Sequence, residues 1–527
     1  MKYLKNLMSI TLVVAIAFIL VACGNNSTEE SQKDGEVITG GELSIGLSSN
    51  AATLDPVLYT GKYESQIMRQ IGETLVQYDL KLENIKPLLA TEWEISDDLK
   101  EYTFKLRDDV HFQKGEFQDG RKMTAEDVKY SLERSAKESV QNRLTGVKEV
   151  QVLDEFSVKI VLDEPNAALM NMLMDPGNMI VPKEEVEGHG KKFSSNLVGT
   201  GPFSLEEFNT GSNVKLVKNG SYWGEEPNLD SVNFKFITDE SMMGNALRTG
   251  DIDIATDITG QNREIIEKSD GMELVTTPGL SITYLDMNFN EGPTSDPKVR
   301  EAIVMATNVE DIVNGVHQWG GAEPAYEPLP RGSWGYSTDL ESNRASYDPE
   351  KAKELLSETQ YKDGFAIDVY LLDTRKEYAT IFQNQMKENL NIDVNINVTE
   401  WGTLVDLVSK GKAPMNIGGW SWYPDPYFFL DQRFHSKNIG SNGNGKGYEN
   451  PEVDNLLDRA RQETIDQEER TKLYQEAMEI IISDNPSVEL DNLEIAFGIS
   501  DKVQGFELPA DGNIVLVSSE VNVSKSK

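Results

Sequence analysis

Alternating apolar and polar residues mark half-buried β-strands at intervals along the whole chain. Successive side chains of a strand point to opposite faces, so a strand with one buried face has an apolar residue at every second position. This alternation occurs over 43–47, 156–162, 232–236, 367–371 and 392–398. We therefore predict strands in all five segments.

Helices are predicted where a capping residue followed by proline comes before apolar residues at helical spacing. The capping side chain accepts a hydrogen bond from a free backbone N–H, and proline at the first helical position has no N–H to lose. Three pairs fit this description, Asp296-Pro297, Asp348-Pro349 and Asn450-Pro451. Asp466, with Glu469 three residues later, predicts a further helix start. Strands and helices are thus mixed, and no internal repeat indicates a solenoid or a propeller.

The segment 102–134 combines both signals. Residues 102–106 alternate, Asp119-Gly120 indicates a turn, and Thr124 with Asp127 predicts a helix start. Taken by themselves, these residues predict a strand, a turn and a helix, without a catalytic group.

The composition indicates a globular protein with a strongly acidic surface. The chain has 527 residues, 38% of them hydrophobic and 26% charged, and this length suggests two or three lobes rather than one small core. With 50 Lys and Arg against 88 Asp and Glu, the formal net charge is −38. Such a surface repels phosphate backbones, so we expect no nucleic-acid partner.

The N-terminal segment has the features of a secretory signal. Two lysines precede an apolar run over 8–21, which is shorter than the roughly 20 apolar residues that a membrane-spanning helix needs. The run ends at Leu20-Val21-Ala22-Cys23, which resembles the lipobox of bacterial lipoproteins. This resemblance implies that a signal peptide, residues 1–22, is removed and that Cys23 carries a lipid. An uncleaved membrane anchor is the alternative.

The segment after the signal is predicted to be a tether. Cys23 is the only cysteine of the chain, so no intramolecular disulfide is expected. The residues up to Gly40 are mostly small or polar and have little to bury. We therefore predict that residues 23–40 form a lipidated, flexible tether, which would hold the protein at the outer face of the bacterial cell membrane.

No motif of an enzyme stands out. The four histidines, His111, His189, His317 and His435, are far apart and have no zinc-like spacing. A Gly-x-Ser-x-Gly elbow, a Walker loop and a dinucleotide fingerprint are absent from the sequence. We expect a protein without catalytic activity, cofactor or bound metal.

An ordered set of motifs resembles the large bacterial solute-binding proteins of the oligopeptide, dipeptide and nickel family, the extracellular solute-binding proteins of family 5. The densest group is Phe104-Lys105-Leu106-Arg107, Val110-His111-Phe112, Asp119-Gly120, Thr124-Ala125-Glu126-Asp127-Val128 and Tyr130-Ser131. Further motifs are Thr53-Leu54-Asp55-Pro56, Gly199-Thr200-Gly201-Pro202-Phe203, Tyr222-Trp223, Gly250-Asp251-Ile252-Asp253, Asn288-Phe289-Asn290, Tyr347-Asp348-Pro349, Pro424-Asp425-Pro426 and Asn450-Pro451. The resemblance runs from about Gly41 to the end of the chain.

The resemblance implies an α/β fold of the periplasmic-binding-protein type (type II, class C), in which two lobes enclose a ligand and an extra domain sits on the first lobe. The implied ranges are 41–80, 196–285 and 488–520 for lobe one, 81–195 for the extra domain and 286–487 for lobe two.

The resemblance also implies a function. The chain is expected to be a monomer that captures oligopeptides or dipeptides and delivers them to the permease and ATPase subunits of an ABC importer. The alternatives are a non-peptide solute (an opine, an oligosaccharide or a nickel chelate) and a peptide-sensing, signalling lipoprotein.

The segment 418–426 is the strongest candidate for ligand contact. Trp420, Trp422 and Tyr423 supply aromatic contact area, while the neighbouring glycines admit close backbone approach and the prolines stiffen the loop. Clefts between lobes are rich in such residues. The alternative is that the two tryptophans pack a corner of a lobe.

Asp425 is the acidic residue of this segment. In peptide-binding relatives an aspartate in the equivalent loop pairs with the α-amino group of the peptide, an ammonium that is costly to bury alone. Counted from Trp420, the family's usual order of Trp, two further residues and Asp is not kept here, because Tyr423 stands where the aspartate is expected, and Asp425 belongs to the Asp-Pro that follows. Asp425 is therefore predicted either to compensate a ligand cation or to cap the turn before Pro426. On the first lobe, Tyr59 is expected at the cleft from its position after Asp55-Pro56.

Overall fold

Two long strands run through the middle of the largest sheet. The computed structural model describes residues 39–526, so Cys23, the expected signal and most of the expected tether lie outside the described residues. Within this part, which belongs to one compact unit, the largest sheet has eleven strands. β12 (Met272–Met287) and β17 (Ser487–Ser500) pair antiparallel in its centre.

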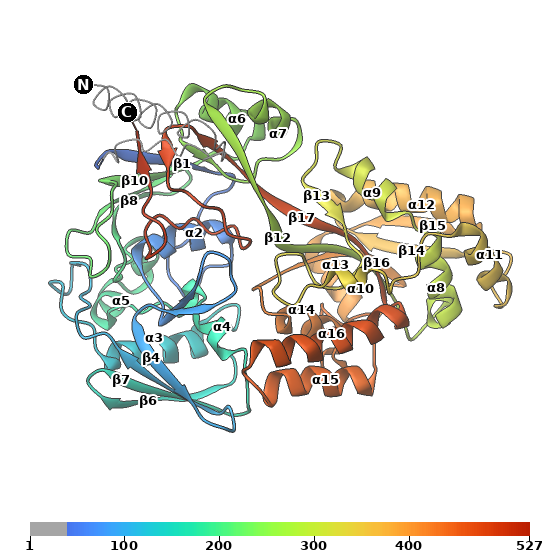
Figure 1. Cartoon of the computed structure of the whole chain (residues 1–527), viewed down its shortest axis with the longest axis horizontal. Helices are drawn as coiled ribbons and strands as arrows, with labels where there is room; N and C mark the ends of the chain where they lie inside the picture. Colours follow the sequence, from blue (N-terminus) through green and yellow to red (C-terminus); the bar gives the residue numbers. More distant parts are fainter. Residues whose placement is uncertain (1–38, 527) are drawn as a thin grey trace, which may run out of the picture. The chain divides into compact units, whose positions relative to one another are not determined.

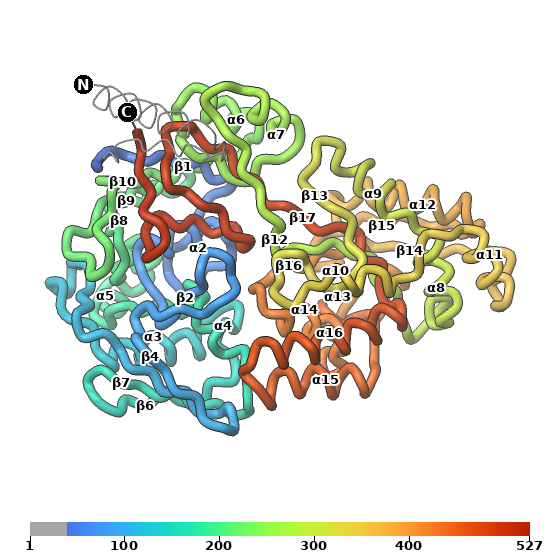
Figure 2. The backbone as a smooth tube through the Cα atoms, viewed as in Figure 1, coloured from blue at the N-terminus to red at the C-terminus, as the bar shows by residue number. Residues whose placement is uncertain are grey.

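The paired strands β12 and β17 change neighbours along their length. Their register shifts between Pro278 and Ile282. Before this point β17 pairs with β11 of one strand group, and beyond it β12 pairs with β16 of another. Figures 1 and 2 show the two strands passing between the groups. The groups are called the first and the second lobe below.

The first lobe contains the N-terminal strand. From β17 its sheet continues through β11 (Ile254–Ala255), β1 (Glu42–Leu47), β10 (Ser231–Phe236), β9 (Asn213–Lys218) and β8 (Phe203–Asn209). Its helices are α2 (Lys62–Ile71), α6 (Glu240–Thr249) and α7 (Gly260–Glu267). Alternate residues of β1 and β10 are buried in one core, among them Leu43, Ile45, Val232 and Phe234. The alternation therefore predicted both strands correctly.

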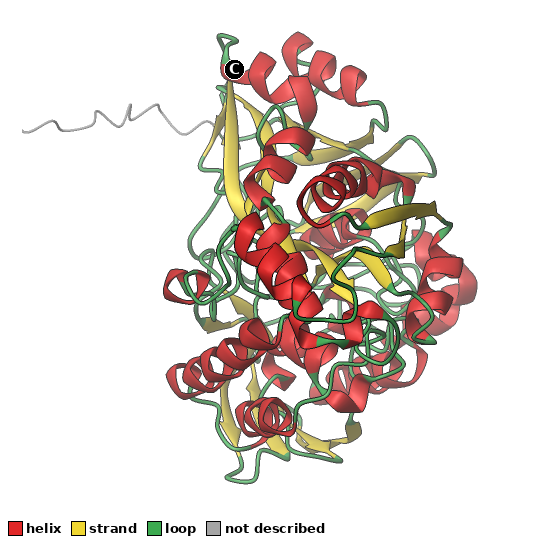
Figure 3. Ribbon diagram, turned by 90° about the vertical axis from the view of Figure 1, so that its right-hand side faces the viewer, coloured by secondary structure: helices red, strands yellow, loops and turns green. Residues whose placement is uncertain are grey.

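The second lobe has a core of its own. From β12 its sheet continues through β16 (Met415–Ser421), β14 (Ala366–Leu371) and β15 (Asp393–Val398), while β13 (Ala322–Pro324) pairs with β17. Its helices are α8 (Pro297–Ala306), α9 (Val309–Val316), α10 (Thr338–Glu341), α11 (Pro349–Ser357), α12 (Lys376–Leu390), α13 (Trp401–Ser409), α14 (Tyr427–Phe434), α15 (Pro451–Gln462) and α16 (Gln467–Asp484). Ile367, Val369 and Val394 are buried in this core, and Figure 3 shows the strands in yellow among the red helices.

The four predicted helix starts are confirmed. The capping side chains accept hydrogen bonds from backbone N–H groups of Lys298, Lys351, Glu452 and Glu469 at 3.0, 3.1, 3.0 and 2.9 Å. These bonds satisfy donors that a helix leaves free at its first turn.

The extra domain is built on an antiparallel sheet of four strands. Its order is β4 (Ala90–Ile95), β5 (Glu101–Leu106), β7 (Ser157–Leu162) and β6 (Val147–Asp154). With it lie β2 (Val76–Tyr78), β3 (Ile85–Pro87), α3 (Ala125–Glu138), α4 (Leu169–Leu173), the 3-10 turn Pro176–Asn178 and α5 (Lys183–His189). Its core, with Phe104 and Leu132, is continuous with that of α14–α16, where Leu457 and Tyr474 are buried.

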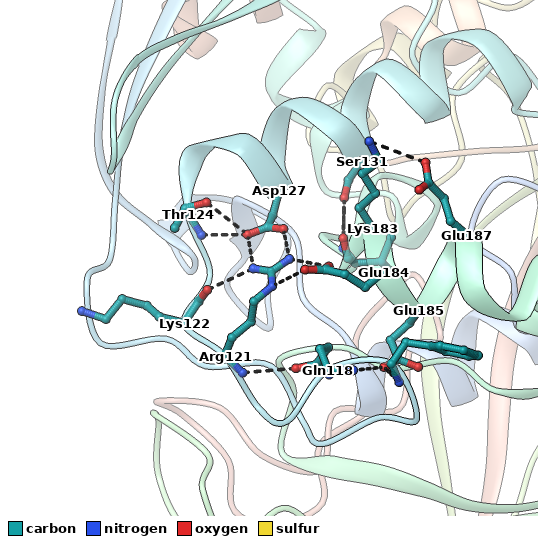
Figure 4. Close-up of polar contacts among 12 residues, drawn as sticks. Gln118, Arg121, Lys122, Thr124, Asp127, Ser131, Lys183, Glu184, Glu185 and Glu187 are labelled. Carbon is teal, nitrogen blue, oxygen red and sulfur yellow. Dashed lines mark hydrogen bonds and ion pairs between the residues drawn. The ribbon is translucent and has the colours of Figure 1, made fainter.

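The family-like motifs around α3 have a structural role. Arg121 donates to both oxygens of Asp127 at 2.8 and 2.6 Å and to both oxygens of Glu184 at 2.8 and 2.7 Å. Asp127 in turn accepts from the Thr124 backbone N–H at 2.9 Å, which confirms the predicted helix start. Figure 4 shows these contacts. One guanidinium thus joins the turn before α3 to α3 and α5.

The C-terminal segment returns to the first lobe. β18 (Val503–Gln504) and β19 (Ser524–Lys525) form a short antiparallel pair there. Between them, the backbone carbonyls of Gly512 and Ile514 accept hydrogen bonds from Gln66 and Gln70 of α2, both at 2.7 Å. In Figure 2 this red segment lies beside the blue strand β1.

Candidate ligand-binding cleft

A cavity of about 880 Å³ has walls from both lobes. The first lobe contributes residues 59–62 and the side of α2, the extra domain contributes Arg143 and Asp175, the second lobe contributes 421–424, and the C-terminal segment contributes 509–520. Pockets of this size enclose most small-molecule ligands. The cavity is the candidate ligand-binding cleft.

Some residues of the predicted aromatic segment line the cavity, and others pack against the lining residues. Trp422 lines the cavity, is 42% exposed and stacks on Phe428 with 6.2 Å between ring centroids. Trp420 also stacks on Trp422, with 6.2 Å between ring centroids, and donates from Nε1 to the Phe428 carbonyl at 2.8 Å. Trp420 is not among the lining residues. Its contacts are those of a packing residue, whereas Trp422 is part of the wall of the cleft.

Asp175 joins the two sides of the cavity. Its carboxylate accepts hydrogen bonds from Tyr59 of the first lobe, at 2.7 Å, and from Tyr423 of the second. Arg143 Nε lies 2.9 Å from the same carboxylate. Burial, followed by the negative charge of Asp175, raises the pKa of both tyrosines well above the usual value. The two hydroxyls therefore stay protonated donors at physiological pH.

Asp425 is fully buried and its carboxylate is saturated by the protein. Arg470 contacts both oxygens at 2.8 and 2.9 Å, Asn171 Nδ2 donates at 2.7 Å and the Tyr427 backbone N–H donates at 2.9 Å. A carboxylate has about four acceptor positions, so none is left for a ligand ammonium. Asp425 is not among the lining residues of the cavity. The geometry matches the turn-capping alternative.

Of the five residues predicted for ligand contact, the cavity thus brings together Tyr59, Trp422 and Tyr423, and it does not include Trp420 and Asp425 in its wall. Whether any of the five touches a bound solute stays a prediction.

Two of the family-like motifs meet at a buried carboxylate. Thr200, Tyr222 and Trp223 each donate to Glu73 at 2.8 Å. A Cβ on Gly199 would collide with the Ile71 carbonyl, so glycine is required where this loop passes α2. Burial raises the pKa of Glu73 to about 7 although the three hydrogen bonds lower it. Glu73 also lines the cavity.

The sequence reasoning missed several residues of the wall, namely Arg69, Glu73, Arg143, Asp175 and Asp511. None belongs to a motif quoted above, and single charged residues are common in a chain with this composition. Only Asp175-Pro176-Gly177 has a local signal, because it reads as a turn.

Among residues 39–526, no group of three or more His, Cys, Asp or Glu side chains is arranged to hold a metal ion. In the same range, no helix is long and apolar enough to span a bilayer.

Comparison with known proteins identifies relatives that match nearly the whole chain. "Probable D,D-dipeptide-binding periplasmic protein DdpA" of Escherichia coli K12 is 32% identical over 477 residues, which cover 88% of this chain and 91% of the relative. Glutathione-binding protein GsiB of Salmonella typhimurium is 29% identical over 489 residues, covering 89% and 92%. Among solved structures, the periplasmic binding protein DppA of Helicobacter pylori, in complex with the peptide STSA, is 29% identical with a TM-score of 0.76 and covers 93% of this chain and 99% of its own.

These similarities confirm the expected two-lobed α/β binding-protein fold. The model of the middle region of the bacterial extracellular solute-binding proteins, family 5, matches residues 84–441, more than half of the chain. This protein belongs to the bacterial extracellular solute-binding proteins, family 5.

Proposed function

We propose that this protein is the lipid-anchored substrate-binding component of an ABC importer and that it captures peptides between its two lobes. The observation that carries the proposal is the cavity with Tyr59 of the first lobe and Trp422 and Tyr423 of the second in its wall. A ligand held there touches both lobes, and a ligand closes two lobes only by binding the closed state better than the open one.

Peptides are the proposed solutes for two reasons. The relatives DdpA and GsiB are named for binding a D,D-dipeptide and glutathione, and the DppA structure holds the peptide STSA. The wall of the cavity also combines the ring of Trp422 with hydroxyl, carboxylate and guanidinium groups. Such a surface suits a short chain of amides that carries charged ends.

Membrane attachment is proposed to occur through Cys23. The lipobox-like sequence places this only cysteine directly after the predicted signal, residues 1–22. Residues 23–40 would then connect the lipid to a monomeric globule at the outer face of the cell membrane, where it meets the permease. Within the globule, we propose the lobe ranges that the family resemblance implied, with 81–195 as the extra domain.

Identification of the solute that co-purifies with the protein tests the proposal. The mature protein is extracted in mild detergent and analysed by native mass spectrometry, then denatured to release the solute. Release of a peptide supports the proposal, and release of an opine, an oligosaccharide or a nickel chelate contradicts its peptide part. If the protein is isolated empty, it is titrated by calorimetry with a panel of dipeptides to pentapeptides. Binding of none of these peptides contradicts the proposed peptide capture.

A further inference from the structure

Arg69 of α2 is a cationic residue in the wall of the cavity, and its Nε has no hydrogen-bond partner. The side chain lies in the last turn of α2 and lines the cavity. Its Nε is buried and has no hydrogen-bond partner, and its guanidinium forms no ion pair with residues 39–526. The Arg69 side chain as a whole is half-buried, and a buried donor left without a partner is costly. An arginine donor without a partner in the wall of a cavity can bond an acceptor that a solute brings.

A second guanidinium lies on the same side of the cavity. The Arg143 side chain is only 5% exposed and lies over the Tyr59 ring, 3.7 Å from the ring centroid. Its Nε pairs with Asp175 and its Nη2 with Gln141, whereas Nη1 is buried without a partner. The charges of Arg143 and Arg69 both act on the Tyr59 hydroxyl, whose pKa they lower against the larger effect of burial. Both cations are therefore close enough to Tyr59 to act on its hydroxyl.

The charge of Arg69 acts on Asp511, whose pKa it lowers against the larger effect of burial, but among residues 39–526 no carboxylate of the wall forms a hydrogen bond or an ion pair with Arg69. Asp511 accepts from the backbone N–H and Nδ2 of Asn513 at 3.0 and 2.5 Å. Glu73 and Asp175 keep the partners described above. The remaining carboxylates of the wall each accept a hydrogen bond from another residue: Asp79 from the Asn84 side chain, Glu225 from the Asn522 side chain, and Glu520 from the Leu80 backbone N–H. Among residues 39–526, the buried charged donors of the wall without a hydrogen-bond partner are thus Arg69 Nε and Arg143 Nη1, in a chain whose net charge is −38.

We propose that Arg69, with Arg143 as a second positive charge beside Tyr59, forms an anion subsite of the cleft that binds a carboxylate of the solute. The planar fork of a guanidinium matches the two oxygens of a carboxylate and can bond both at once. The inference rests on the proposed capture of a solute in this cavity and adds which part of the solute is recognised. On a peptide, the carboxylate is that of the C-terminus or of an acidic side chain.

Four probes distinguish a C-terminal carboxylate from a side-chain carboxylate. They also distinguish failure of the anion subsite from failure of the proposed function. They are trialanine, trialanine C-terminal amide, Ala-Glu-Ala C-terminal amide and citrate, each titrated by calorimetry into the mature wild-type protein, Arg69→Gln and Arg69→Lys. Arg248→Gln is the matched control, because Arg248 lies on α6, donates to Asn245 and is not part of the cavity. Arg69→Gln breaks no ion pair among residues 39–526 and is expected to fold, which circular dichroism verifies.

The expected result is that wild type binds trialanine at least about tenfold more tightly than its amide, since hydrogen bonds to a charged group commonly contribute this much. Arg69→Gln abolishes the difference, Arg69→Lys keeps part of it and Arg248→Gln keeps all of it.

If Ala-Glu-Ala amide instead shows the Arg69-dependent gain over trialanine amide, the subsite holds a side-chain carboxylate. Equal binding of all three peptides by wild type overturns the subsite and leaves peptide capture standing. Binding of citrate alone, lost in Arg69→Gln, overturns peptide capture and supports the subsite, and binding of no probe overturns both.

Discussion

Asp425 and Arg470 form a buried ion pair at the base of the aromatic segment, with Arg470 Nη1 2.8 Å from the Asp425 carboxylate. Asn171 of the extra domain donates to the same carboxylate at 2.7 Å. The pair thus holds the loop that carries Trp422 and Tyr423 against α16 and the extra domain. We propose that Asp425 positions this loop and does not itself contact the solute.

The substitution Asp425→Asn tests this role. It leaves the Arg470 guanidinium buried without its counterion, which commonly costs about 3 kcal/mol or more. We expect a clear fall in the free energy of unfolding, measured by urea denaturation, and the same change in affinity for a free and an N-acetylated peptide. Asp458→Asn is the control, because the Asp458 side chain is 42% exposed and its ion pair should contribute little. A stable Asp425→Asn variant that no longer distinguishes the two peptides would assign Asp425 to the peptide amino group.

Trp422→Ala should weaken peptide binding without a matching loss of stability. The substitution removes an exposed ring from the cavity wall, and a tryptophan at a binding surface commonly contributes ~2 kcal/mol, roughly 30-fold in affinity. Calorimetry with a bound peptide measures the effect. Trp401→Ala is the matched control, because Trp401 is 58% exposed at the start of α13 and lies outside the cavity. If the two variants bind the peptide with equal affinity, Trp422 does not contact it.

The stability of the protein should fall as pH rises through neutrality. Burial raises the pKa of Glu327 from the ordinary 4.5 to about 8, and its Oε2 is buried without a partner. Between these two pKa values the unfolded chain has lost the proton that the folded chain keeps, so ionisation favours unfolding progressively over this range. Glu73, with a pKa of about 7, acts in the same direction.

Urea denaturation at several pH values between 5 and 8 measures this effect. Glu327→Gln, which stays neutral and retains an acceptor for the Ser337 backbone N–H, should flatten the decline. A variant whose stability falls as steeply as that of wild type would show that Glu327 is not the group responsible.

Cys23→Ala tests the lipid anchor. Without the sulfur, no acyl chain can be attached, and the protein should accumulate unprocessed or be released into the medium. Fractionation of cells followed by immunoblotting measures this, with Cys23→Ser as a second variant that also lacks a thiol. Mature protein that still partitions with membranes at the wild-type level would contradict the assignment.

Local signals in the sequence predicted the elements of the fold but not the contacts that complete the site. The strand at 43–47 and the cap at Asp296 depend on neighbours within a few residues, so their patterns are visible in the chain itself. The partners of Asp425, in contrast, are 45 and 254 residues away. Tyr423 meets Asp175 across 248 residues. Such pairs arise only from packing of distant segments, which no periodicity records.

The same limit explains the missed arginines. Arg69 lies on the polar side of an ordinary amphipathic helix and has no sequence feature that separates it from a solvated residue. What distinguishes it is an Nε that is buried in the wall of the cavity without a hydrogen-bond partner, and this property depends on α2, the extra domain and the C-terminal segment together. The aromatic segment was recognisable because several unusual residues occur within nine positions.

A peptide is proposed to bind in the cavity between the two lobes. The most direct test is a crystal structure of the mature protein with its co-purifying peptide, or with trialanine if it is isolated empty. We predict density for the peptide inside the cavity, in contact with Trp422 and with a carboxylate facing Arg69. Density for the peptide outside the cavity, or a cavity that stays empty at a saturating concentration, would contradict the account.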